Sequence, residues 1–202
     1  MEPMGKSRLE AFSDGVLAII ITIMVLELKV PHGVDFAALK PVLPVFSSYV
    51  LSFVYVAIYW NNHHHLLHSV KQVSGGILWA NLNLLFWLSL FPFTTAWIGE
   101  NHIAPWPVAV YGFVLFMAAV SYALLQRIII ARQGPDSLLA RAIGGDWKGK
   151  LSMTLYLVAI PAAFWQPWSA IGSYVAVALL WLVPDSRIER ALSARGSRSQ
   201  NR

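Results

Sequence analysis

The stretch 151–184 constrains the fold most, because it is 34 residues long and contains no charged side chain. A soluble domain needs charged groups to cover its surface, whereas lipid tolerates their absence. About 20 apolar residues suffice for a helix to cross the hydrocarbon, so this stretch is too long for one ordinary span. Near its middle, Gln166-Pro167-Trp168 favours a break in the helix. We therefore predict two shorter membrane helices joined by a tight turn.

Four further apolar segments precede this stretch, at 12–26, at about 45–60, within 72–99 and between 103 and 126. Two of them begin with a proline: Pro44 precedes the second segment and Pro105 lies near the start of the fourth, and the first turn of a helix accepts proline. We predict an all-α integral membrane protein with six transmembrane helices. A single transmembrane domain is expected at 1–185, followed by a basic cytoplasmic tail at 186–202.

The composition agrees with this fold class. Apolar residues make up 57% of the chain and charged residues 12%, whereas charged residues are about a quarter of typical globular domains. Six spans would use about 120 residues and leave no room for a separate globular domain. The chain contains no cysteine, which excludes disulfides, thiolate catalysis and thiolate metal sites.

Basic residues are distributed unevenly between the predicted loops. One side of the membrane receives both termini and two loops, and it carries all Lys and Arg residues except Lys29 and Lys40. Because cytoplasmic loops are rich in Lys and Arg, we expect both termini in the cytoplasm and the chain in the cell (plasma) membrane. The net charge of +5 then reflects topology and attraction to membrane lipid. No nucleic-acid partner is expected.

Polar residues gather at the predicted cytoplasmic ends of the first three spans. They are Arg8, Glu10, Ser13 and Asp14, then Trp60, Asn61, Asn62, His63, His64, His65 and His68, and finally Asn81 and Asn83. Because they lie at similar depth, they can form one hydrogen-bonded cluster. Ionisable residues within spans are costly and face protein by default. Two interpretations stay open: the cluster caps and packs helices, or it senses protons or coordinates ions.

The histidines at the end of the second span are candidate metal ligands. His64 and His68 are four residues apart and share a helix face, as two metal ligands can. However, the chain has no H-E-x-x-H pattern and no third ligand at a suitable spacing, so we expect no metal site and no cofactor. There is also no G-x-S-x-G motif, phosphate loop or spaced carboxylate pair. We therefore expect no catalytic residue and no enzymatic activity.

The sequence R-L-E-A-F-S-D-G at 8–15 places an arginine four residues before F-S-D, at the opening of the first span. It resembles the signature of the transmembrane protein 175 family in its short prokaryotic form. W-N-N-H-H at 60–64 is similar to the end of that family's second span, and 83–95 is similar to its third. The resemblance covers the first half of the chain, while spans four to six match mainly in number and length.

This resemblance implies a potassium-permeable channel that is a homotetramer of six-span chains, with the first helices lining a central pore. It also implies a structural polar network in which Arg8, Phe12, Ser13 and Asp14 are held by groups on spans two and three. We assign these groups as Trp60, Asn62, His63, His64 and Asn83. No T-V-G-Y-G filter is present, so selectivity by rings of backbone carbonyls is excluded in its usual form.

One stripe of the first span is apolar apart from a single hydroxyl beside it. With Ile19 taken as zero and about 100° per residue, Phe12, Gly15, Ile23, Leu26 and Thr22 fall within about 60° of it. The resemblance implies that the pore constriction lies five residues after the signature aspartate, at Ile19. Ile23 and Leu26 would extend this hydrophobic gate, and Thr22 would lie beside the pore and contribute to selectivity.

Asp14 lies about 140° around the helix from Ile19 and is expected to face neighbouring helices. We expect its carboxylate to accept hydrogen bonds from groups near Asn62, His63, His64 or Asn83, with Arg8 as a nearby counter-charge.

Two rival functions stay open. The first is a proton- or metal-coupled membrane transporter that uses Asp14 and the cluster His63–His68. The second is a membrane scaffold without transport activity, and a membrane enzyme ranks below both. The leading hypothesis has no cofactor, and its partners are further copies of the chain, membrane lipid and potassium ions.

Overall fold

The computed structural model describes residues 5–182 except 135–136, 138 and 141–143. All regular elements in this part of the chain are helical. They are α1 (Lys6–Leu26), the 3₁₀ helix η1 (Phe36–Val42), α2 (Leu43–His68), α3 (Gly75–Ser89), α4 (Phe91–Glu100), α5 (Pro105–Gln133), α7 (Trp147–Ala162) and α8 (Pro167–Leu182). The all-α class is confirmed. The predicted tail at 186–202 lies outside the described residues.

Four helical segments are long and apolar enough to cross a membrane, namely Lys6–Leu26, Phe36–His68, Gly75–Glu100 and Pro105–Gln133. The other two, α7 and α8, have 16 residues each. At 1.5 Å per residue each is about 24 Å long, shorter than a typical hydrocarbon core of about 30 Å. The predicted break at Gln166-Pro167-Trp168 is confirmed, because α7 ends at Ala162 and α8 begins at Pro167.

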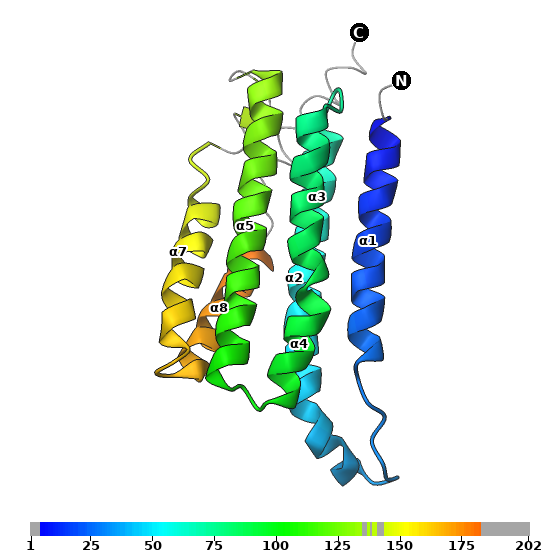
Figure 1. Ribbon diagram of the computed structural model, residues 1–202, viewed down its shortest axis with the longest axis vertical. Coiled ribbons are helices and arrows are strands. Elements are labelled where there is room, and N and C mark those ends of the chain that lie inside the picture. Colours follow the sequence, from blue (N-terminus) through cyan, green and yellow to red (C-terminus); the bar gives the residue numbers. More distant parts are fainter. Residues whose placement is uncertain (1–4, 135–136, 138, 141–143, 183–202) are drawn as a thin grey trace, which may run out of the picture.

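The third predicted span is two helices rather than one. α3 ends at Ser89 and α4 begins at Phe91, with Leu90 between them. Pro92 lies in the first turn of α4, where its missing N–H removes one hydrogen bond to the preceding turn. α3 and α4 nevertheless follow one another along the length of the bundle and together form one candidate membrane span (Figure 1).

α1 lies at one edge of the bundle and packs on α2, α3 and α4 (Figure 1). α5 is central, because it packs on α3, α4, α7 and α8. α1 and α3 begin at the same end of the bundle, and α2 and α5 end there. This end therefore brings together residues 8–14, 60–68 and 81–83, as the six-span order predicts.

At the opposite end, Lys29 follows α1 and its ammonium group donates a hydrogen bond to Glu100 at the end of α4, 2.8 Å away. The bond to the Glu100 carboxylate raises the pKa of Lys29 above its ordinary value. Both side chains are exposed, so this ion pair is screened by solvent.

Candidate pore-lining face and polar cluster

The stripe predicted on the first span is the face of α1 that the chain leaves uncovered. The side chain of Ile19 is 59% exposed and that of Leu26 is 75% exposed, and Phe12 and Ile23 are also exposed. The opposite face is packed, because Leu17 is 1% and Met24 is 2% exposed. One face of α1 is therefore free to meet lipid, water or another chain.

Thr22 lies on the exposed side of α1. Its hydroxyl donates a hydrogen bond to the Ala18 carbonyl oxygen at 2.9 Å. Because the hydroxyl proton is engaged with the backbone, the free lone pairs of the oxygen remain available on the exposed side. The arrangement presents an oxygen acceptor, the kind of group that replaces water around a cation.

A buried chain of hydrogen bonds joins the signature residue Ser13 to α3 and α2. The Asn81 amide nitrogen donates to Ser13 Oγ at 3.0 Å, and Asn81 Oδ1 lies 2.6 Å from His63 Nε2. Ser13 Oγ in turn donates to the Leu9 carbonyl at 2.9 Å. Ser13, His63 and Asn81 are all buried. These hydrogen bonds link α1, α2 and α3. Leaving any of the buried polar groups without a partner would destabilise the folded protein.

Asp14 bonds to Trp60, which belongs to the predicted network but was not among the donors expected for this carboxylate. Its carboxylate accepts a hydrogen bond from Trp60 Nε1 at 3.0 Å, and both residues are exposed. Arg8 is exposed as well, and within the described residues it makes no salt bridge to Asp14. The Asp14–Trp60 bond therefore ties α1 to α2 at the rim of the cluster rather than in its buried centre.

Three other predicted members of the network lie outside this chain of bonds. Asn83 donates to Ser121 Oγ on α5 at 2.7 Å, and Asn62 donates to the Ile58 carbonyl of its own helix at 2.8 Å. His64 is exposed and stacks on Trp60. Asn81, in contrast, was not among the assigned network residues. Asn81 lies four residues after Ile77 and three before Leu84, on the buried face of α3, and this helical spacing is the signal that identifies it.

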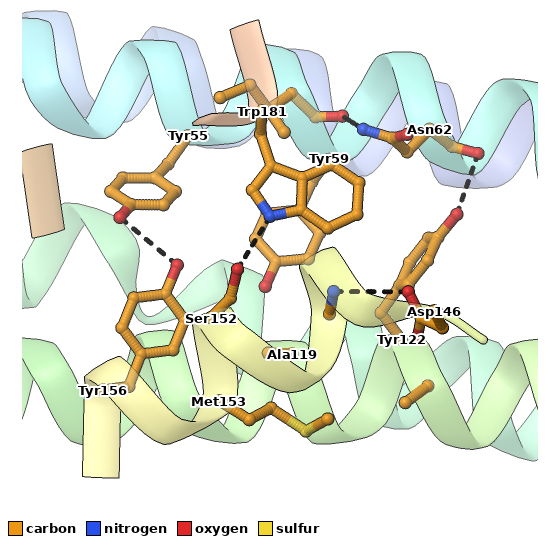
Figure 2. A pocket seen from close by; sticks show the side chains of 13 residues that line it. Tyr55, Tyr59, Asn62, Ala119, Tyr122, Asp146, Ser152, Met153, Tyr156 and Trp181 are labelled. Atoms are coloured by element: carbon orange, nitrogen blue, oxygen red, sulfur yellow. Dashed lines mark hydrogen bonds between the residues drawn. The ribbon is translucent and has the colours of Figure 1, made fainter. Parts of the chain in front are cut away.

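A separate cavity of about 50 Å³ is lined by residues of α2, α5, α7 and α8 and by none of α1 (Figure 2). Aromatic side chains line much of it, including Tyr59, Tyr122 and Trp181. Two polar groups on its wall are paired: the Tyr122 hydroxyl donates to the Asn62 carbonyl at 3.2 Å, and Trp181 Nε1 donates to Ser152 Oγ at 2.9 Å. Among the network residues predicted from sequence, only Asn62 lines this cavity.

The transporter hypothesis required ion-binding or titrating groups in a cluster. No group of three or more His, Asp or Glu side chains is placed to hold a metal ion in the part of the chain that the structure describes. The fold and the exposed first helix thus define the class of this protein as a multi-span helical membrane protein.

Comparisons with known proteins narrow this class. The family model described as "Endosomal/lysosomal potassium channel TMEM175" matches residues 8–92. A potassium channel of Chryseobacterium sp. (strain P1-3) is 58% identical, over 94% of this chain and 98% of its own length. The human endosomal/lysosomal proton channel TMEM175 is 37% identical over 42% of this chain and 19% of its own length.

A solved structure agrees with the sequence relatives. The crystal structure of a lysosomal potassium-selective channel TMEM175 homolog from Chamaesiphon minutus superposes with a TM-score of 0.74 at 29% identity, covering 89% of this chain and 97% of that one. The chain belongs to the TMEM175 family. Because this is a family of ion channels, the chain is a membrane channel protein and not an enzyme.

Proposed function

We propose that this protein is a potassium-permeable channel, and that it works as a homotetramer with α1 of each copy lining a central pore. The observation that carries the proposal is the uncovered face of α1, which holds the apolar stripe and the Thr22 oxygen. Family membership and the potassium-channel names of the Chryseobacterium and Chamaesiphon relatives support potassium as the ion.

The position of α1 at the edge of the bundle supports an oligomer. A helix at the edge of a bundle can line a path only if other copies close that path from the other side. Several copies around an axis would enclose a channel between their first helices, whereas one bundle of this size would have difficulty doing so. The number four comes from the resemblance to the family's prokaryotic members.

The gate is a hydrophobic constriction. Four Ile19 side chains at one level would leave too little room for hydrated potassium, and the gap would lose its water and close without a charged barrier. Ile23 and Leu26, one and two turns further along, would lengthen the dry segment. Opening then requires the four α1 helices to move apart or rotate.

Selectivity would come from side chains. The Thr22 oxygens of four copies, each with its proton donated to Ala18, would face a passing cation with their lone pairs. They can replace part of the hydration shell of potassium when the constriction opens. The buried Ser13–Asn81–His63 bonds and the Asp14–Trp60 bond would hold each α1 at the correct distance from the axis.

The channel would lie in the cell membrane with both termini in the cytoplasm, as the distribution of basic residues indicates. The cluster around Ser13 would then stand at the cytoplasmic mouth of the pore, and Lys29 and Glu100 at the outer end. Membrane lipid would cover the apolar faces of the peripheral helices.

The deciding experiment is a reversal-potential measurement on the purified protein in planar bilayers, with potassium on one side and sodium on the other. We expect single-channel currents and a reversal potential displaced towards that of potassium. A potential at zero would contradict potassium preference. Transport strictly coupled to a pH or metal gradient would support the transporter instead, and the absence of ion flux in liposomes would support a scaffold.

A further inference from the structure

The last two turns of α2 carry an aromatic ladder formed by Trp60, His64 and His68. The rings of Trp60 and His64 are stacked with centroids 6.0 Å apart, and those of His64 and His68 are stacked 6.2 Å apart. All three side chains are exposed. Against the expectation from the sequence that there is no metal site, we propose that His64 and His68 form a binding site for one divalent transition-metal ion, of the chemistry of Ni²⁺, Cu²⁺ or Zn²⁺.

The helix already holds the two imidazoles in a suitable arrangement. Residues four apart lie above one another on a helix face. Two nitrogens bound to one ion at about 2.0–2.1 Å each lie at most about 4.2 Å apart. The rings of His64 and His68 are inclined by only 20° at 6.2 Å, so their nitrogens converge by a tilt of each ring towards the other. Exposed side chains make such rotamer changes on the picosecond to nanosecond timescale, and the backbone stays in place.

The donor set selects the class of metal. Imidazole nitrogen suits nickel, copper and zinc, whereas magnesium and calcium prefer oxygen ligands. Since no third His, Asp or Glu joins the pair among the described residues, water would complete the coordination. The site therefore binds reversibly and does not resemble the closed four-ligand sites that stabilise a fold.

The two neighbouring histidines, His63 and His65, differ in how well they could serve as metal ligands. His63 is buried and engaged with Asn81, so it cannot turn outward without breaking that bond. His65 is partly exposed, with its ring edge-on to that of His64 at 5.6 Å, and it is three residues from His68. Because His65 is a neighbouring imidazole that is not part of the stacked pair, it is the matched control for His64 and His68.

Charged groups on α1 surround this end of α2. Lys6 Nζ donates to the His68 carbonyl oxygen at 2.6 Å and lies 3.8 Å from the Glu10 carboxylate. Asp14 accepts from Trp60, and Arg8 is exposed on the same helix. Two cations and two carboxylates offset one another, so ligation by imidazole and not bulk charge would supply the affinity.

The ladder also connects the metal site to α1. His64 stacks on Trp60, and Trp60 Nε1 is bonded to Asp14. Tilting the His64 ring towards a metal alters this stack and hence the restraint on α1. This second step rests on the proposed function, because it supposes that α1 lines the pore.

Binding is tested by titrating NiCl₂ into the purified full-length protein in a calorimeter, without an affinity tag that would itself bind nickel. We expect one Ni²⁺ per chain in the parent protein and no binding of Mg²⁺. Since two linked ligands bind far more tightly than one, His64→Ala and His68→Ala should each weaken binding roughly tenfold or more. His65→Ala should bind as the parent does.

Unchanged nickel binding in the double variant His64→Ala/His68→Ala would overturn the site. An equal loss in His65→Ala would also overturn it, because it would move the ligands to His65 and His68. All three side chains lie at the surface of the chain, so the variants are expected to fold, which circular dichroism checks.

The coupling to α1 is tested separately by potassium flux in liposomes with and without NiCl₂, each variant being compared with its own flux before nickel. We expect nickel to change the flux of the parent and not that of His68→Ala. Nickel binding without any change in flux would overturn the coupling and leave the binding site standing. A parent without potassium flux before nickel would contradict the proposed function, and the calorimetry would still decide the site.

Discussion

At the scale of single residues, Ile19 provides the direct test of the gate. Replacing Ile19 with asparagine places a polar group at the constriction, which should keep water there and raise potassium conductance. If dewetting contributes about 1.4 kcal/mol to the barrier, conductance rises roughly tenfold. Single-channel recording in planar bilayers measures the change.

The matched control is Val25→Asn. Val25 and Ile23 are equally exposed, at 43%, but Val25 lies about 120° around the helix from Ile19. Leu17 and Met24 point even further from Ile19, yet they are buried, so polar substitutions there would test folding instead. If Val25→Asn raised conductance and Ile19→Asn did not, the pore face would have been assigned to the wrong side of α1.

Asn81 is predicted to stabilise the assembly of α1, α2 and α3. Asn81→Ala removes the donor to Ser13 Oγ, which keeps its own bond to the Leu9 carbonyl, and it removes the partner of His63 Nε2 while both residues stay buried. The loss should cost about 1–3 kcal/mol. Thermal unfolding in detergent measures the loss. Asn83→Ala is the control, since Asn83 is exposed and its side chain donates a hydrogen bond to Ser121, outside the Ser13–Asn81–His63 bonds. An equal or larger loss in Asn83→Ala would contradict a special role for the buried bonds.

The helix face on which a residue of α1 lies could be predicted from the sequence, whereas the hydrogen-bond partner of a polar side chain could not. The regular 100° step of a helix placed Ile19, Ile23 and Leu26 on one face, and that face is the exposed one. Hydrogen-bond partners depend on how α1, α2 and α3 are rotated against one another, which no single helix encodes. Asp14 therefore meets Trp60, and Asn81 rather than Asn83 meets Ser13.

At the scale of helices, two glycines should respond to the same substitution with opposite signs. A Cβ atom at Gly99 of α4 would stand 2.7 Å from the Val45 Cα of α2, so Gly99→Ala must push the two helices apart. Overpacking of this kind costs about 1–3 kcal/mol. At Gly172 of α8 a Cβ meets nothing within 4 Å, and alanine should stabilise the helix by about 0.5–1 kcal/mol.

Melting temperatures of the two variants in the same detergent compare them directly. A destabilised Gly172→Ala would indicate that another chain or part of the protein packs against α8. An unchanged Gly99→Ala would indicate that α2 and α4 are not held as closely as their backbones imply.

The positions of helix breaks could be predicted where proline combines with other turn signals. Gln166-Pro167-Trp168 in a charge-free run predicted a turn, and α7 ends at Ala162 and α8 begins at Pro167. Pro92 lacks such neighbours, so the break between α3 and α4 was missed. α2 continues through His68 because histidine and asparagine are tolerated in a helix once packing on its neighbours supports it.

At the scale of the whole molecule, topology is tested with accessibility tags at residue 1, in the 32–40 loop and at residue 202. We expect inside, outside and inside, because basic residues predominate on the side of both termini. Protease protection of the tags in sealed cells gives the answer. Tags at the two termini on opposite sides would contradict an even number of spans.

Fold class and family could be predicted from the sequence, since long charge-free runs and the R-x-x-x-F-S-D pattern are local features. The oligomer could not be derived from the residues alone. An isoleucine that faces a symmetry axis and one that faces lipid are both apolar and both exposed in a single chain. Polar residues that are uncovered on α1, such as Thr22, Asp14 and Arg8, suggest that something other than hydrocarbon meets this helix.

The tetramer can be tested by cross-linking through a single introduced thiol, because the chain contains no cysteine of its own. Leu26→Cys places one thiol per chain at the end of the exposed stripe, where four copies would converge on the axis. A bifunctional thiol reagent should join chains in pairs, because each chain carries one thiol. Val25→Cys, about 100° away on the same turn, should cross-link far less.

Native mass spectrometry of the assembled protein should give four times the chain mass of 22.5 kDa. A species of one chain mass that still conducts potassium would contradict a pore between subunits and place the path within the single bundle.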